Sequence, residues 1–216
     1  MFYHKAKNII IPHRFHARFA GAIASFWWNR DFHLPPIDRE SRILWVSDHD
    51  RWYDEFDTVD LMSLEDKTEE RLHQRTLYYH NALQRKNNNN ISDNIALMHT
   101  KHMCNEFPEY QEHIDTIIAG QNKEKIDYEA IQTITNLCDY ISYDCSLWKD
   151  THWTIEVKNF IDSMVNIQYI IKDKTVTVHP RPFNTEKFEV MLYGCKKENY
   201  PNDISIEGVL YTFIKK

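Results

Sequence analysis

Apolar residues recur at steps of three and four over the first two thirds of the chain, which is the spacing of one face of an α-helix. The clearest case is 126–148, where Ile134, Leu137 and Ile141 follow one another at that spacing. Further helices are expected at 13–28, 39–53 (with Asp38 as N-cap), 64–84 and 110–119. Ser92 or Asp93 is expected to cap another helix, which carries Ile95 and Met103 and is interrupted by Pro108. The pattern therefore predicts a helical body over roughly residues 13–158.

After about residue 160 the spacing of the apolar residues changes. Two runs of β-branched residues, 166–171 and 175–178, flank Lys172-Asp173-Lys174, which is typical of a β-hairpin. Two more strands are expected at 187–192 and 208–214, and 8–11 is read as a short strand or an extended lead-in. The C-terminal part of the chain therefore predicts a small antiparallel sheet.

Together these elements predict a mainly α fold, α+β overall, in which a helical bundle carries a small C-terminal antiparallel β-sheet. We expect a helical body at 1–158 and a β appendage at 159–216 that packs on it in one compact domain. The chain has 216 residues, of which 42% are hydrophobic, and this is enough to build a real core. Only 4 residues are glycine, and the Gly-rich loops that cradle nucleotide phosphates do not occur.

The charge and the cysteines bear on partners and location. A formal net charge of −6 argues against binding to nucleic acid through its phosphates. No apolar run reaches the ~20 residues that cross a bilayer, so no membrane partner is expected. The 4 cysteines are widely separated, which favours a reducing, cytoplasmic setting. An exposed edge of the C-terminal strands is compatible with a homodimer.

Four residues in three separate stretches suggest a metal centre: His16, the pair His49-Asp50, and Asp139, in the order H…HD…D. Each lies among apolar residues in a segment expected to be helical. Imidazole nitrogen and carboxylate oxygen suit a divalent ion such as Zn, Mn, Fe or Ni. Such an ion lowers the pKa of a bound water toward ~7 and polarises a phosphoryl oxygen. A buried carboxylate such as Asp139 is costly unless it is paired or metal-bound.

Each of these residues also has an ordinary structural interpretation. The chain contains 12 histidines, so an H…HD…D order can arise by chance. His16 could be a core histidine bonded to a backbone carbonyl, and Asp50 could cap a turn. Asp139 could accept a hydrogen bond from a lysine or an arginine.

His102 and Arg51 are candidates for contact with a substrate. His99 and His102 are three residues apart on an expected helix, a spacing that can chelate a metal. We expect His102 to face inward and His99 to face outward or toward the rim. Arg51 is either a ligand for a substrate phosphate or, as is more common, a surface arginine.

Five stretches occur in order along nearly the whole chain: His16-Ala17-Arg18-Phe19-Ala20-Gly21, 43–52 with His49-Asp50, 96–102, Leu137-Cys138-Asp139-Tyr140-Ile141-Ser142, and 178–183. Together they resemble the DUF3891 family, whose members carry segments like H-A-R-L-A-G, H-H-D-D-G-W, A-L-L-V-S-x-H, D-x-L-S and D-P-W-P-F. The chain departs from the family at Asp48, where a histidine is frequent, and at Arg51-Trp52, which replaces Asp-Gly. These departures put the roles of those positions in question.

The H…HD…D order in turn resembles the HD-domain metal-dependent phosphohydrolases, a helical superfamily. This resemblance implies an HD-like helical bundle in which His16, His49, Asp50 and Asp139 hold the metal. It also implies that His102 supports the ligands, contacts a phosphate or binds a second metal. The expected function is hydrolysis of a small phosphorylated substrate (a nucleotide or phosphoester) by metal-activated water, with His102 or Arg51 steadying the substrate. Two alternatives stay open: a non-catalytic ligand- or metal-binding protein, and an iron-dependent oxygenase.

Overall fold

The computed structural model describes residues 2–4, 7–29, 31–32, 38–51, 91–103, 112, 115–116, 128–158, 163–200 and 206–215. Over this part of the chain the α-helices are α1 (His13–Ala24), α2 (Arg39–Ser47), α4 (Ile91–Met103) and α6 (Tyr128–Ser146). The helices α1, α2 and α6 lie within stretches predicted to be helical, and α4 begins at Ile91, before the predicted N-cap at Ser92 or Asp93. The helix predicted at 64–84 is outside the described residues. Of that predicted at 110–119, only 112, 115 and 116 are described, and they are helical.

The start of α2 is held by the residue predicted to cap it. Asp38 accepts hydrogen bonds from the backbone N–H of Ser41 at 2.8 Å and from its hydroxyl at 2.6 Å. The helix ends at Ser47, several residues earlier than the apolar pattern suggests. As a result His49 and Asp50 lie in the turn that follows α2 rather than on the helix itself.

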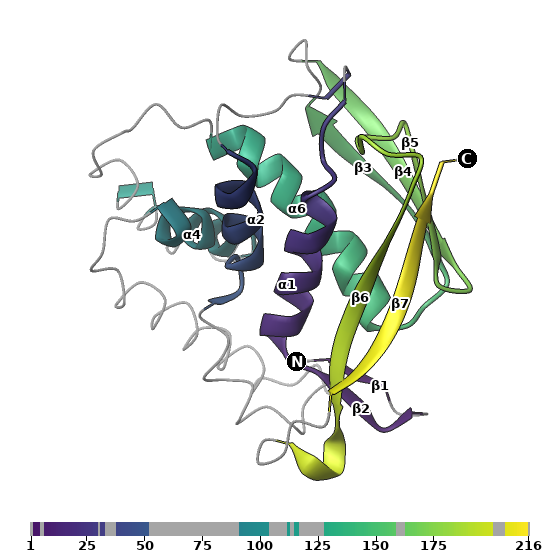
Figure 1. Ribbon diagram of the computed structural model, residues 1–216. Helices are drawn as coiled ribbons and strands as arrows, with labels where there is room; N and C mark the ends of the chain where they lie inside the picture. Colours follow the sequence, from purple (N-terminus) through teal and green to yellow (C-terminus); the bar gives the residue numbers. More distant parts are fainter. Residues whose placement is uncertain are drawn as a thin grey trace.

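The strands form one seven-stranded sheet in the order β1-β2-β6-β7-β5-β4-β3. Their bounds are β1 (Phe2–His4), β2 (Ile9–Ile11), β3 (Thr151–Lys158), β4 (Met164–Lys172), β5 (Thr175–His179), β6 (Lys187–Lys196) and β7 (Ile206–Ile214). Neighbouring strands are antiparallel except β5 and β7, which are parallel. The sheet curls along one side of the helices (Figure 1).

The prediction of a mainly α helical bundle with a small C-terminal antiparallel sheet is wrong. The sheet is mixed and large, and it recruits β1 and β2 from the N-terminus and β3 from the stretch assigned to the helical body. Trp153, Ile155 and Val157 alternate with polar residues along β3, as expected of a strand, but of its described side chains only Val157 is buried, so the hydrophobic face is weak. Its partner β4 supplies the context that makes it a strand. The domain boundary at residue 158 stays a prediction.

The core fills the space between the curled sheet and the helices α1 and α6. Phe19 and Ile23 of α1 and Ile141 of α6 pack there with Tyr169 and Phe213 of the sheet. At Gly21 the helices α1 and α2 approach so closely that an added Cβ would collide with the Ser47 side chain and lie 2.8 Å from the Ile43 carbonyl oxygen. This close approach brings α1, which carries His16, next to the end of α2 and the turn after it, which carries His49.

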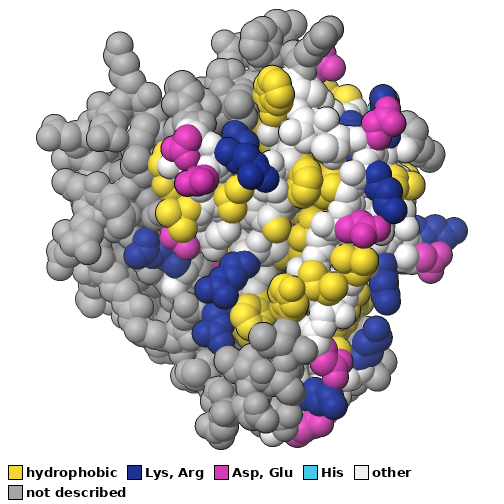
Figure 2. Space-filling model, in the orientation of Figure 1, with side chains coloured by type: hydrophobic (Ala, Val, Ile, Leu, Met, Phe, Trp, Pro, Cys, Tyr) yellow, Lys and Arg dark blue, Asp and Glu magenta, His cyan; other side chains and the backbone are white. Residues whose placement is uncertain are grey.

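The outer face of the sheet is partly apolar. Met191 and Tyr193 on β6 and Leu210 on β7 are exposed. Val190 and Leu192, which alternate with Met191 and Tyr193 along β6, are buried. This is the alternation expected of a strand with one face on the core. Hydrophobic side chains gather in a band on the face shown in Figure 2. Over the described residues, none of the helices is both long enough and apolar enough to cross a membrane.

Candidate metal centre

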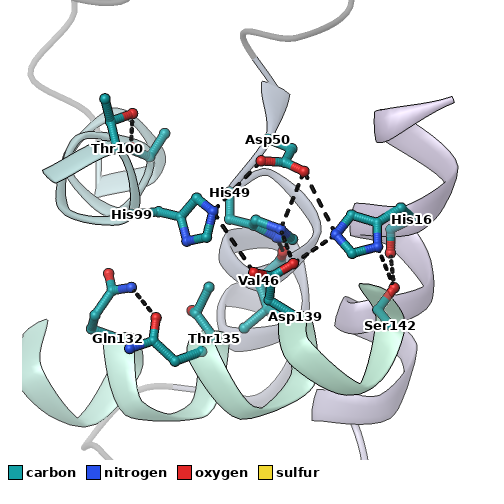
Figure 3. Close-up of polar contacts among 12 residues, drawn as sticks. His16, Val46, His49, Asp50, His99, Thr100, Gln132, Thr135, Asp139 and Ser142 are labelled. Carbon is teal, nitrogen blue, oxygen red and sulfur yellow. Dashed lines mark hydrogen bonds and ion pairs between the residues drawn. The ribbon is translucent and has the colours of Figure 1, made fainter. Parts of the chain in front are cut away.

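Three segments that are remote in sequence place His16, His49, Asp50 and Asp139 around one point. His16 lies in the first half of α1, His49 and Asp50 in the turn after α2, and Asp139 in the second half of α6. One ligand atom from each of the four lies within 4.8 Å of the others. Figure 3 shows their side chains converging between the three segments. The set is the one predicted from the H…HD…D order.

The closest contacts join imidazole nitrogens to carboxylate oxygens. The Nε2 atoms of His16 and His49 lie 2.6 Å and 3.2 Å from Asp139 Oδ1. The same two nitrogens lie 3.7 Å and 3.5 Å from Asp50 Oδ2. The side chains of His16, His49 and Asp50 are 2%, 0% and 7% exposed, and that of Asp139 is 16% exposed. Two acids and two imidazoles therefore meet with very little water around them.

Ser142 fixes which nitrogen of His16 carries a proton. Its hydroxyl donates to the backbone carbonyl of His16 at 2.8 Å and lies 2.7 Å from His16 Nδ1. A carbonyl oxygen only accepts, so the single hydroxyl proton of Ser142 goes to it. Nδ1 of His16 must then be the N–H that donates to Ser142. In the neutral ring, Nε2 presents its lone pair to the carboxylates.

His49 is fixed in the same way by the last turn of α2, the helix that precedes it. Its Nδ1 lies 2.6 Å from the carbonyl oxygen of Val46 and donates to it. Its Nε2 therefore also turns toward Asp139 and Asp50. Two nitrogen lone pairs facing two carboxylates would repel, so each contact needs either a proton on Nε2 or a shared cation. Proteins usually orient a metal-binding histidine in this way: the ring nitrogen that does not face the metal donates its N–H to a carbonyl or hydroxyl oxygen.

The charges of this cluster shift the pKa values of His49 and Asp139. Burial by itself lowers the pKa of His49, but the charges of Asp50 and Asp139 and the hydrogen bond to Asp139 outweigh it and raise this pKa to about 9. Burial likewise raises the pKa of Asp139, but His49 and His16 outweigh it and hold this pKa well below its ordinary value. The protein without a bound cation therefore keeps the Nε2 proton of His49 at neutral pH.

His99 is a fifth member of the cluster, and the prediction that it faces outward or toward the rim is wrong. It is 3% exposed, and its Nε2 lies 3.6 Å from Asp50 Oδ1 and 3.9 Å from Asp139 Oδ2. Each carboxylate thus turns one oxygen to His16 and His49 and the other to His99 (Figure 3). Helical spacing alone gave no signal for this placement, because His99 follows Ile95 by four positions and His102 follows Met98 by four positions.

The remaining predicted residues are not placed in the cluster. The side chain of His102 lies outside the described residues, so its inward orientation and its role stay predictions. Arg51 is exposed and directly follows Asp50. Its contact with a substrate phosphate also stays a prediction. Asp139 was also considered as a partner of a lysine or an arginine. In the structure its carboxylate instead forms hydrogen bonds with the imidazoles of His16 and His49.

Comparison with known proteins identifies a family but no activity. The family described as "Protein of unknown function (DUF3891)" matches residues 3–196. No curated protein and no solved structure matches the chain. The matched region includes all five residues of the cluster.

Proposed function

The chain belongs to the DUF3891 family, and from the geometry of its His/Asp cluster we propose that it is a metal-dependent hydrolase of a small phosphorylated molecule. The ion is a divalent metal (Zn, Mn, Fe or Ni), held by His16, His49, Asp50 and Asp139. The HD-domain resemblance is part of this proposal and has no support beyond the order and convergence of these residues.

The observation that carries the proposal is the direction of the two imidazoles. Both Nδ1 atoms are used as donors, to Ser142 and to Val46, so both Nε2 atoms are directed at carboxylate oxygens. A divalent cation at the centre would replace the protons that otherwise neutralise these contacts. Two nitrogens and two carboxylates also form a mixed donor set that suits a hydrolytic metal better than a closed structural cage.

The residues of the site divide the chemical work. The bound ion would lower the pKa of a water ligand and polarise a phosphoryl oxygen. Asp50 and Asp139 hold the negative charge that retains the ion, and Ser142 keeps His16 in the binding tautomer. In this proposal His99, whose Nε2 lies 3.6 Å from Asp50 Oδ1 and 3.9 Å from Asp139 Oδ2, donates a hydrogen bond to a phosphoryl oxygen. Arg51 supplies an exposed positive charge beside the site for a substrate phosphate.

A non-catalytic metal-binding protein is the second candidate. The specific observation in its favour is the burial of His16, His49 and Asp50, which leaves Asp139 as the most accessible of the four ligands. A protein of this kind would retain its metal but turn over no phosphorylated substrate. The same donor set also suits iron in an oxygenase.

The test is the metal content of purified protein and of the Asp139→Ala variant, with Asp31→Ala as the matched control at an exposed position. We expect bound metal in the wild type and in Asp31→Ala, and its loss from Asp139→Ala with helical content retained by circular dichroism. Unaltered metal content in Asp139→Ala would refute the assignment. Hydrolysis of p-nitrophenyl phosphate and of nucleoside monophosphates then separates an enzyme from a metal-binding protein. Metal analysis after aerobic and anaerobic purification separates iron from the other ions.

A further inference from the structure

The strand β3 forms one edge of the sheet. It pairs with β4 on one side, and among the described strands none lies against its other side (Figure 1). The pairing with β4 runs without interruption from Thr151 to Lys158, so β3 contains no bulge. Along such an edge, every second residue directs its backbone N–H and C=O away from the neighbouring strand. β3 therefore presents a regular row of backbone donors and acceptors that a further strand could use.

β3 lacks the features by which proteins usually protect an edge strand. Those features are short length, proline, bulges and charged side chains that point toward the core. β3 has 8 residues and no proline, whereas β1, at the other edge of the sheet, has only 3 residues. His152 and Glu156 are exposed and alternate with the residues of the core face. The edge at β3 is therefore the one suited to the addition of a strand.

The core face of β3 is apolar and incompletely covered. Val157 is buried, Ile155 packs against the core, and Trp153 lies on the same face because side chains two residues apart in a strand point the same way. The neighbour of Trp153 on β4 is Tyr169, which is 1% exposed and donates a hydrogen bond to Asp144 of α6. Trp153 itself is 57% exposed. A large aromatic side chain left uncovered beside an open strand edge is typical of a protein interface.

We propose that β3 pairs with β3 of a second copy of this chain, antiparallel about a two-fold axis, so that the two sheets join into one. The sequence of β3 is complementary to itself when Thr154 lies opposite Thr154 of the partner subunit. His152 then lies opposite Glu156 of the partner subunit, and Trp153 lies opposite Ile155 of the partner subunit. Each pair occurs twice, and cross-strand pairs of opposite charge or of two apolar side chains stabilise a sheet. The cores of both copies lie on one side of the joined sheet. This inference does not depend on the proposed function.

The charges distinguish this register from its neighbours. A shift by one residue would turn the two cores to opposite sides of the sheet, so the nearest alternatives are shifts by two residues. One such shift brings His152 opposite another basic side chain, Lys158 of the partner subunit. The other brings Asp150 opposite Glu156 of the partner subunit. Because side chains of like charge directly opposite each other destabilise a sheet, the register centred on Thr154 is favoured.

The first test is the oligomeric state of the full chain, measured by sedimentation velocity over a range of protein concentrations. We expect the wild type to be a dimer. Trp153→Lys places a charge on the core face of the edge and should give a monomer. Trp28→Lys is the matched control, because Trp28 is also exposed, at 54%, and lies outside β3. It should remain a dimer.

The second test exchanges the charges of the proposed pair. His152→Glu would face Glu156 of the partner subunit and should raise the dissociation constant of the dimer about tenfold. The double variant His152→Glu/Glu156→Lys should restore it. Within one chain the two residues lie roughly 13 Å apart along the strand, and they face Ile170 and Asn166 on β4. A rescue would therefore report contact between copies. His179→Glu, at an exposed histidine on β5, is the matched control and should leave the dissociation constant unchanged.

The third test locates the axis by cross-linking. Two Thr154→Cys side chains would lie opposite each other with Cβ atoms about 5 Å apart, so a short bis-maleimide should join the two copies. Gln168→Cys is the matched control, because Gln168 is exposed and lies next to Thr154 one strand further from the edge. It should cross-link no more than the wild type does.

Four results overturn the proposal: a wild type that is monomeric at every concentration, a dimer that Trp153→Lys leaves intact, a His152→Glu defect that the second substitution does not rescue, and equal cross-linking of the two cysteine variants. If Trp153→Lys does not fold, the charge exchange and the cross-linking decide the question, because both change only exposed side chains on the outer face of the sheet.

Discussion

The Ser142 hydroxyl donates a hydrogen bond to the carbonyl oxygen of His16 at 2.8 Å and lies 2.7 Å from Nδ1 of the same residue, where its oxygen can accept a hydrogen bond from the ring. One serine on α6 thereby determines which nitrogen of a histidine on α1 faces the acids of the cluster. Asp139 lies three residues before Ser142 on the same helix, so α6 supplies both a candidate ligand and the group that orients a second candidate, His16. The geometry of the candidate centre therefore depends on how α1 and α6 pack against each other.

Replacing Ser142 with alanine should weaken metal binding without unfolding the protein. The variant releases His16 Nδ1, so the ring can adopt the other tautomer or rotate, and loss of such a supporting group typically costs ~10–100-fold in metal affinity. Competition with a chelator of known affinity measures the change. Ser25→Ala is the matched control, because its hydroxyl also donates to a carbonyl on α1, that of Ala22, but touches no histidine of the cluster. Equal affinities in Ser142→Ala and the wild type would contradict the role assigned to this serine.

The metal-free protein should lose stability as the pH rises from 6.5 through about 9. The pKa of His49 is raised in the folded state from 6.5 to about 9, so its stabilisation is fully present below 6.5 and is lost as the pH passes the folded value. A shift of this size corresponds to a free energy on the order of 3 kcal/mol. Urea unfolding at several pH values measures it.

A His49→Gln variant provides the control for this pH dependence, because it cannot gain or lose the proton in question. Its free energy of unfolding should change less between pH 6.5 and pH 9 than that of the wild type. At acidic pH the stability depends on pH in the opposite direction, because there Asp139 is the group that gains a proton. The pKa of Asp139 is held well below 3.8, so its contribution is present above that value and is lost as the pH falls toward the lowered one. A wild-type stability that does not change between pH 6.5 and pH 9.5 would contradict the charge state assigned to His49.

Metal binding at neutral pH should release at least one proton. With a pKa of about 9, His49 carries a proton on Nε2 at pH 7 that a metal ion must displace. Calorimetric titration of the metal-free protein with Zn²⁺ or Mn²⁺ in two buffers of different ionisation enthalpy gives the number of protons released. Binding with no proton release would mean that the ion does not bind at His49 Nε2.

Replacing Gly21 with alanine should destabilise the protein and weaken the metal site. Glycine to alanine in a helix ordinarily stabilises by about 1 kcal/mol. Here the new Cβ would collide with the Ser47 side chain and approach the Ile43 carbonyl oxygen to 2.8 Å. Forcing α1 and α2 apart costs about 1–3 kcal/mol and moves His49 away from His16. Urea unfolding and metal affinity report both effects.

Gly208→Ala on β7 is the matched control for this substitution, because its added Cβ would meet only the flexible side chain of Met191. We expect a smaller loss of stability there and no change in metal affinity. If Gly21→Ala proved as stable as the wild type, the close approach of α1 and α2 would not be what brings the two histidines together.

The sequence by itself identified the four residues that converge in the candidate metal centre and most of the described helices. Periodicity and caps are local properties, so α1, α2, α4 and α6 could be predicted from the spacing of apolar residues and from Asp38. The order of His16, His49-Asp50 and Asp139 could also be read directly. A polar residue placed within an apolar helical stretch is visible without knowledge of the fold, because burying it unpaired would be costly.

Only the tertiary structure decided how the strands assemble into one sheet, the place of His99 and the contact of Ser142 with His16. β3 is a strand because it pairs with β4, and β1 and β2 join a sheet whose other strands lie more than a hundred residues away. The choice between His99 and His102 depends on how α4 is rotated against α2 and α6, and helical spacing leaves that rotation open. The tautomer of His16 depends on a hydrogen bond between residues 126 positions apart. Contacts of this kind follow from packing, and no local pattern in the chain contains them.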